Sequence, residues 1–460
     1  MASPTPILAA FAMAQMFFAA HGLAQNASAT FTTLYDFQSV ADGKIPYGNL
    51  VQDAHGVLYG VTYSGGTSKE DIGVSSGYGT VYSLTPPASS GGAWTEAVIY
   101  SFKGGKDGFW PKQGLTMGKD GALYGATYGG GDLSCNAHGF GCGVVFRLAP
   151  PASTGGAWRQ TVLHSFTGGD DGMTPSGSLA LGSNGELYGT TAQGGNAANC
   201  QPTGCGVAFA LAPPTAPGGG WTESILYSFD IVDGDGGPDT TGLVIGSDGS
   251  LYGTTVYGGA SKGTKVCTNG CGTIFQLTPP GSSGGAWTES EIYSFSGTGD
   301  GGVPGPAILG SNGALFGATG GGGASGTGVV YELAPPSSPG GSWVETVLYN
   351  FAASKGSPKG VTSLVFGGSG ELYATTYSGG KHNGGTLIKL TPPASDSDSW
   401  QQSVLYGFPH PPNTKDTAAA GGLLLGSHGG LFGITTYGGS GQCEVRGAVI
   451  GCGTVFELQP

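Results

Sequence analysis

The sequence predicts an all-β fold, a seven-bladed β-propeller of four-stranded blades closed by the N-terminal strand, which completes the last blade. A core of the type Gly-x-Leu-Tyr-Gly recurs seven times in the 460 residues, as expected of a repeat architecture. The 94 glycines disfavour helices, because each costs about 0.5–1 kcal/mol in a helix interior, and the 20 Phe and 20 Tyr disfavour disorder. The core leucines, whose numbers differ by 57 to 65, are Leu58, Leu123, Leu187, Leu251, Leu315, Leu372 and Leu431.

The first two strands of each repeat are expected to form a hairpin. An apolar residue lies eight positions before each core leucine, and the intervening residues alternate and end in a polar turn such as Ser183-Asn184-Gly185. Turns of this kind supply the positive φ of a tight hairpin. The apolar positions are Leu50, Leu115, Leu179, Leu243, Ala307, Leu364 and Leu423.

Two further strands complete each repeat. A Gly-Thr-Val-Phe-x-Leu pattern, clearest at residues 272–277 and 453–458, predicts the third strand, and the Pro-Pro that follows most copies would end it. A tryptophan then opens a fourth strand that runs into Leu-Tyr-Ser-Phe or a variant. We expect this strand outermost and the Leu50-type strand around the central channel. The tryptophans are Trp94, Trp158, Trp221, Trp287, Trp343 and Trp400.

The order of the strands at the two ends of the chain predicts how the ring closes. The first Leu-Tyr-x-Phe copy, residues 34–37, precedes the first core, whereas the chain ends just after a third strand. Pairing of residues 32–37 with the strand that ends at Leu458 would complete the last blade and remove exposed sheet edges. We therefore expect residues 30–460 to form one domain. The alternative is an open solenoid.

Residues 1–24 have the pattern of a signal peptide. The apolar stretch from Ile7 to Ala20 is followed by small-residue exits at residues 22–24 and 27–29, although the amino terminus is the only positive charge before it. The alternative is an apolar leader that stays attached. The stretch is shorter than the roughly 20 residues of a spanning helix, and no second apolar span follows. A secreted or periplasmic monomer without a membrane span is expected.

The formal net charge of −13 disfavours nucleic acid as a partner, because such proteins concentrate Lys and Arg on one face. The sequence also contains no His-Glu-x-x-His pair and no phosphate-binding loop.

The eight cysteines fall into four close pairs, each inside one loop of its own repeat. The pairs are Cys135 with Cys142, Cys200 with Cys205, Cys267 with Cys271, and Cys443 with Cys452. Local disulfides are the simplest of the 105 connectivities that eight cysteines allow, and they fit an exported protein. Zinc binding is the alternative, but no second pair of Cys or His lies at a suitable spacing within a repeat.

The run Gly185-Glu186-Leu187-Tyr188-Gly189-Thr190-Thr191, followed by Gly194-Gly195 and a Gly-x-Val-Phe type of strand, resembles the GloVer tandem repeat of secreted bacterial "choice-of-anchor" proteins. The resemblance covers essentially all of the chain after the leader. It implies export and surface or extracellular residence, and it supplies no catalytic residues. Members often carry a C-terminal sorting anchor, whereas this sequence ends at Pro460, which favours release or periplasmic residence.

The loops after the second and fourth strands are expected on one face of the propeller, which we call the loop face. In the loop after the fourth strand, Asp-Gly precedes a proline at Asp42, Asp107, Asp171 and Asp300, and with a shorter gap at Asp235. These carboxylates could bind calcium, the one cofactor that the sequence suggests, or sugar hydroxyls. The alternative is ordinary Asp-Gly turn chemistry.

The second strand ends in a tyrosine in five copies, which are Tyr63, Tyr128, Tyr257, Tyr377 and Tyr437. Aromatic rings around a funnel suit stacking on a pyranose, because the apolar ring face matches the C–H face of the sugar. The alternative is structural packing.

Residues that break the repeat are further candidates, because a binding site in a pseudo-symmetric ring needs asymmetry. Those in the loops after the fourth strand are Lys44, Trp110, Lys112, Lys359 and His410, and those in the cysteine-type loops are His138, Lys262, Lys265 and His382. Among these, His138, His382 and Lys112 are the catalytic candidates, and Trp110 joins the tyrosines and aspartates as a ligand-binding candidate. His164 only replaces the tyrosine of its strand.

Two functions are compatible with these features. The first hypothesis is a secreted binding propeller that recognises extracellular glycan on the loop face. The alternative is a carbohydrate-active enzyme, a polysaccharide lyase or glycosidase, with its site at the mouth of the central channel and its carboxylates drawn from different blades. A third reading is a structural or protein-interaction role.

Overall fold

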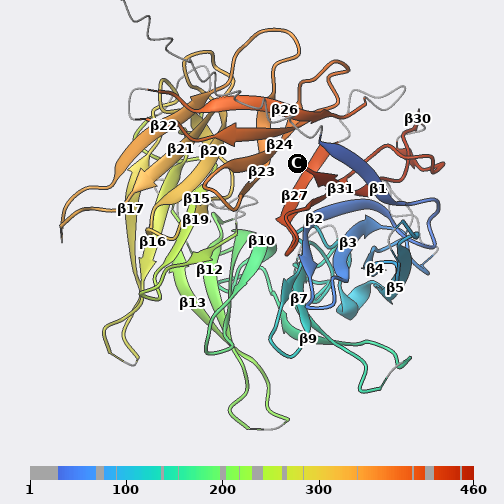
Figure 1. The fold of residues 1–460 in the computed structure, drawn as a ribbon. Coiled ribbons are helices and arrows are strands. Elements are labelled where there is room, and N and C mark those ends of the chain that lie inside the picture. Colours follow the sequence, from blue (N-terminus) through green and yellow to red (C-terminus); the bar gives the residue numbers. More distant parts are fainter. Residues whose placement is uncertain are drawn as a thin grey trace, which may run out of the picture.

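The computed structural model describes residues 29–68, 77–89, 91–135, 139–153, 155–196, 204–216, 218–230, 242–261, 267–282, 284–338, 340–395, 398–409, 419–445 and 448–460. The predicted signal peptide, residues 1–24, lies outside them. Seven antiparallel sheets follow one another around a ring in the order of the sequence (Figure 1). The predicted seven-bladed β-propeller is therefore confirmed.

The first four blades follow the predicted strand order from the inside outward. Blade 1 contains β2 (Lys44–Gln52), β3 (Leu58–Ser64), β4 (Thr80–Thr85) and β5 (Thr95–Ser101). Blade 2 contains β6 (Thr116–Met117), β7 (Leu123–Thr127), β8 (Val144–Ala149) and β9 (Arg159–Ser165). Blade 3 contains β10 (Met173–Leu181), β11 (Leu187–Gln193), β12 (Val207–Ala212) and β13 (Thr222–Ser228). Blade 4 contains β14 (Val244–Ile245), β15 (Leu251–Thr255), β16 (Thr273–Thr278) and β17 (Thr288–Ser294).

The last three blades vary this plan. In blade 5 the first strand is split into β18 (Gly302–Pro304) and β19 (Ile308–Leu309), which precede β20 (Leu315–Gly321), β21 (Val329–Ala334) and β22 (Val344–Asn350). Blade 6 contains β23 (Lys359–Phe366), β24 (Leu372–Ser378), β25 (Thr386–Thr391) and β26 (Gln401–Gly407). Blade 7 contains β27 (Ala419–Leu425), β28 (Leu431–Thr435) and β31 (Thr454–Gln459), and a small hairpin, β29 (Glu444–Val445) with β30 (Ala448–Val449), lies in its loop.

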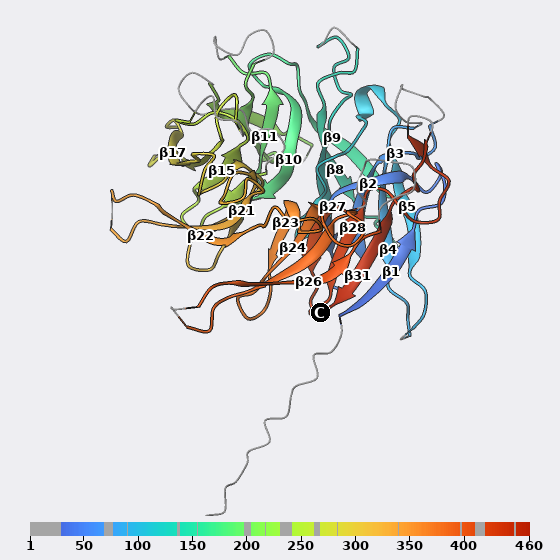
Figure 2. The same ribbon diagram turned by 90° about the horizontal axis from the view of Figure 1, so that it is seen from above.

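The N-terminal strand closes the ring. β1 (Thr30–Asp36) pairs antiparallel with β31, with Thr30 opposite Gln459 and Asp36 opposite Thr454. Figure 2 shows the two strands side by side. Neighbouring first strands contact each other around the axis, as β2 does with β27, so the first strands are innermost as predicted. The Trp-led strands form the outer edges of blades 1 to 6, and β1 forms that of blade 7.

Hydrophobic clusters join each blade to the next. At the junction of blades 1 and 2, for example, Val81 and Phe102 pack with Leu123 and Phe146. In blades 2 to 5 the tryptophan that opens the fourth strand packs edge-on against the core tyrosine of the preceding blade, and Trp158 lies in this way 5.8 Å from Tyr59. The repeated aromatic residues therefore hold blade to blade.

The described residues contain one short turn of 3-10 helix, η1 (Gly105–Asp107). Within these residues we find no helix of the length and apolar character needed to cross a membrane.

Candidate functional site

Disulfides fix the cysteine loops of the loop face. Cys135–Cys142, Cys267–Cys271 and Cys443–Cys452 are bonded as predicted. Cys205 is also disulfide-bonded, and Cys200 lies outside the described residues. Because these sulfurs are oxidised, they do not act as zinc thiolates.

Three of the cysteine loops support the entry of the chain into the next blade. The carbonyl oxygens of Cys452, Cys142 and Cys271 accept hydrogen bonds of 2.7–2.9 Å from the backbone N–H groups of Ile45, Thr174 and Val303. These three residues precede prolines and have φ angles of 59°, 53° and 60°. Such backbone costs on the order of 1–3 kcal/mol in a non-glycine residue, so the surrounding loops must hold it.

The aspartates of the loop face are bonded within their own turns. Asp42 accepts hydrogen bonds of 2.9 Å from the hydroxyl of Tyr35 and from the N–H of Gln38. Asp107 is bonded in the same way by Tyr100 and Lys103, Asp300 by Tyr293 and Ser296, and Asp171 by His164 and Thr167. These carboxylates therefore order the turn after the fourth strand. Their proposed role toward calcium or sugar stays a prediction.

An aromatic cluster on the loop face, which we call the aromatic patch, joins blades 1 and 2. Trp110, only 6% exposed, stacks on Tyr63 with ring centroids 5.4 Å apart, and it lies 6.3 Å from Tyr128 and 5.7 Å from Phe140. Its backbone N–H donates to the carbonyl of Tyr78, and its backbone carbonyl accepts the N–H of Tyr128. The patch consists of Tyr47, Tyr63, Trp110, Lys112, Tyr128 and Phe140.

Three rings of the patch face solvent, since Tyr47, Tyr128 and Phe140 are 43%, 38% and 40% exposed. The ammonium of Lys112 lies 4.2 Å from the ring centroid of Tyr128 and 5.3 Å from that of Tyr63, in cation–π contact with both. Burial, followed by the neighbouring Tyr128, Tyr47 and Tyr437, raises the pKa of Tyr63 to about 12, so its phenol stays neutral.

The other predicted residues lie elsewhere. Tyr257 and Tyr377 are 43% and 49% exposed on blades 4 and 6, and His382 is exposed in a turn of blade 6. Lys44 is buried at the start of β2, and Lys359 begins β23. Outside the described residues lie His138, His410, Lys262, Lys265 and Asp235.

The predicted site residues did not include the glutamates that follow the tryptophan by two positions in four of the fourth strands, of which three, Glu96, Glu223 and Glu345, have a clearly raised pKa. Burial raises the pKa of each to about 7, and the neighbouring aspartate also raises it. The recurrence of Trp-x-Glu was the available signal. Of the described residues, His164, Asp171 and Glu223 form the group that could hold a metal ion.

Comparison with known proteins assigns the repeat. The Gloeobacter/Verrucomicrobia repeat matches residues 71–267 and again residues 203–449. The chain belongs to this family. Membership of the Gloeobacter/Verrucomicrobia repeat family confirms the resemblance seen in the sequence. No curated protein matches the chain.

Solved structures similar to this member of the Gloeobacter/Verrucomicrobia repeat family differ in function. One is the extracellular domain of a one-component system from B. thetaiotaomicron, with a TM-score of 0.51, 11% identity, and coverage of 94% of this chain and 42% of that one. A second is PorZ, a bacterial surface component of the type-IX secretion system of Porphyromonas gingivalis. It has a TM-score of 0.51 and 13% identity, and the match covers 93% of this chain and 48% of that one. A third is virginiamycin B lyase from Staphylococcus aureus. It has a TM-score of 0.48 and 14% identity, and the match covers 94% of this chain and 100% of that one. At these identities the likeness shows the fold alone.

Proposed function

We propose that this protein is a secreted binding propeller that recognises extracellular glycan through the aromatic patch. The observation that carries the proposal is the pair of exposed rings, Tyr128 and Phe140, beside the buried Trp110, with the exposed Tyr47 near Tyr63. A ring face matches the C–H face of a pyranose, and a phenol hydroxyl at its edge can bond to the sugar's hydroxyls.

The packing of the patch supports a binding role. Trp110 is buried and bonded through its backbone to both blades, so the rings around it lose little freedom when a ligand binds. Lys112 adds a donor beside two rings in a chain whose net charge is −13. The disulfides of the loop face support export, because such bonds persist in oxidising compartments.

The test is to pass the oxidised protein over a panel of immobilised polysaccharides and to record both retained protein and released oligosaccharide. Tyr128→Ala and Phe140→Ala should each weaken retention by about tenfold, which corresponds to roughly 1.4 kcal/mol. Tyr377→Ala is the matched control, since Tyr377 is an exposed tyrosine at the same repeat position in blade 6.

An equal loss in Tyr377→Ala would contradict the assignment to blades 1 and 2. Released oligosaccharide would favour the alternative, a carbohydrate-active enzyme. Absence of retention on every polysaccharide would count against glycan as the ligand.

A further inference from the structure

The fourth strands of blades 2 and 3 bring three metal-ligating side chains together. His164 lies on β9, Asp171 in the loop that follows it, and Glu223 on β13. The imidazole Nε2 lies 3.3 Å from Asp171 Oδ2 and 3.5 Å from Glu223 Oε1, and the ligand atoms of all three lie within 4.8 Å of one another. One ring nitrogen therefore faces two carboxylate oxygens.

These separations match the spacing of metal ligands, and the contact of His164 with Asp171 is at most a long hydrogen bond. An N–H···O bond has a typical length of about 2.9–3.0 Å, so both contacts of the imidazole are longer than a typical hydrogen bond. Around a tetrahedral zinc ion with bonds of about 2.0–2.2 Å, neighbouring ligand atoms lie roughly 3.3–3.6 Å apart. Both measured distances agree with that spacing.

The burial of the cluster points the same way. The side chains of His164, Asp171 and Glu223 are 20%, 15% and 15% exposed. Glu223 Oε1 is shielded from solvent and accepts no hydrogen bond from the described residues, which is costly for a carboxylate oxygen. Asp171 is held by the N–H and hydroxyl of Thr167, at 2.8 and 2.6 Å, as outer partners orient a metal ligand.

Equivalent positions around the ring show what is distinct here. Where blade 2 has His164, other copies have a tyrosine, as in Tyr35 beside Asp42 and Tyr293 beside Asp300. Beside Asp107, the glutamate position is occupied by Gln160. Among the described copies, an imidazole meets two carboxylates at the junction of blades 2 and 3.

We infer that His164, Asp171 and Glu223 bind one divalent transition-metal ion, with Zn²⁺ the best match, and that the ion links the fourth strands of blades 2 and 3. Imidazole suits zinc, whereas calcium takes six to eight oxygen ligands. Three protein ligands leave a coordination position for water or for a group of a bound molecule.

The test is calorimetric titration of Zn²⁺ into the EDTA-treated, oxidised protein. We expect one equivalent to bind, and Ca²⁺ to bind at least a hundredfold more weakly. His164→Tyr should weaken Zn²⁺ binding by at least a hundredfold and Glu223→Gln by at least tenfold. Both variants should fold, because the ring itself uses Tyr and Gln at equivalent positions. His382→Asn, which changes an exposed histidine of blade 6, is the control and should bind as the wild type does.

A wild-type protein that retains no equivalent of Zn²⁺ would overturn the inference, as would His164→Tyr binding as tightly as the wild type or Ca²⁺ binding more tightly than Zn²⁺. In the wild type, one equivalent of Co²⁺ should give visible d–d absorption. This readout decides the matter even if a variant fails to fold.

Discussion

The last glycine of each Leu-Tyr-Gly core lies opposite an aromatic ring of the third strand. Gly189 pairs with Phe209, and a Cβ at Gly189 would lie 2.6 Å from the ring. In blade 6 the same pair of positions holds Ala374 and Ile388. The methyl group of Ala374 on the second strand is thus matched by a smaller side chain, Ile388, on the third strand. The two positions vary together in the repeat.

We expect Gly189→Ala to lower the free energy of unfolding by about 1–3 kcal/mol, because the methyl group overpacks the core against Phe209. The double variant with Phe209→Ile should recover part of this loss, since it reproduces the pair of blade 6. Denaturant unfolding of both single variants and the double variant measures the coupling.

Gly281→Ala is the control for that cycle, because no atom lies within 4 Å of a Cβ at Gly281. If the effects of Gly189→Ala and Phe209→Ile on the free energy of unfolding are strictly additive, the two side chains are not coupled.

The fourth strand and the loop after it form the element that carries most of the chemistry. Tyr293, Asp300 and Glu345 meet at the junction of blades 4 and 5, where Asp300 accepts the tyrosine hydroxyl and Glu345 is half-buried. Burial raises the pKa of Glu345 to about 7, and Asp300 adds to the effect. In the unfolded chain this carboxyl has its ordinary pKa near 4.5.

The raised pKa predicts how stability depends on pH. Glu345 makes its full contribution to the free energy of unfolding below about pH 4.5. This contribution is lost as the pH rises toward 7, because the folded protein holds the proton more tightly than the unfolded chain does. Glu345→Gln should therefore be more stable than the wild type at pH 8, by at most about 1 kcal/mol because solvent screens the group, and equal to it at pH 4. Denaturant midpoints at the two pH values test this, and a difference independent of pH would refute it.

The disulfide loop is a second element with its own energetics. Cys267 and Cys271 close a loop of only a few residues, and the carbonyl of Cys271 receives the N–H of the strained Val303 in blade 5. We expect the double variant Cys267→Ser/Cys271→Ser to lose about 2 kcal/mol of stability. Hydrogen exchange should also become faster at the amide of Val303, and an unchanged rate there would show that the loop does not support the next blade.

The strands and the disulfide pairs could be predicted from the sequence because their signals are local and repeated. The aromatic patch was only half visible, since Tyr63, Trp110 and Lys112 were candidates whereas Tyr47 and Phe140 were not. The cluster of His164 and Glu223 escaped because its members come from different blades. Their separation in the sequence reflects the length of a repeat, so no motif spacing reveals the contact.

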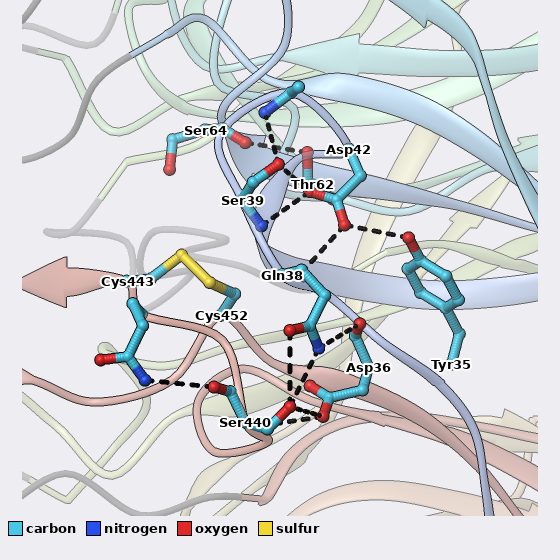
Figure 3. The surroundings of a disulfide bond; sticks show 12 residues. Tyr35, Asp36, Gln38, Ser39, Asp42, Thr62, Ser64, Ser440, Cys443 and Cys452 are labelled. Carbon is cyan, nitrogen blue, oxygen red and sulfur yellow. Dashed lines mark hydrogen bonds between the residues drawn. A yellow bond between two sulfur atoms is a disulfide. The ribbon is translucent and has the colours of Figure 1, made fainter.

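At the scale of the whole molecule, the junction of β1 with blade 7 is the one place where the chain ends must meet. Asp36 Oδ2 accepts the N–H and the hydroxyl of Ser440, at 2.8 and 2.7 Å, beside the Cys443–Cys452 bond (Figure 3). In blade 3 the equivalent residue is Ser228, which accepts the N–H of Asn196 at 3.1 Å. A carboxylate thus replaces a hydroxyl where the connecting chain is missing, and hydrogen bonds to charged groups are the stronger ones.

We expect Asp36→Ala to lower stability by about 1.5–3 kcal/mol and to expose β1 to proteolysis, whereas Ser228→Ala should cost only about 1 kcal/mol. Thermal unfolding and limited proteolysis of the two variants provide the comparison. If both lose the same stability and β1 remains protected, Asp36 has no special part in closing the ring.

Closure of the ring also affects the order in which the strands can pair while the chain is being synthesised. The partner strand of β1 lies far along the chain, since Asp36 and Ser440 are 404 positions apart. Contacts of such separation are slow to form, because the long intervening chain must first be brought together. Until β31 has been made, β1 remains an open edge, so the first strand of the ring is the last to find its neighbour.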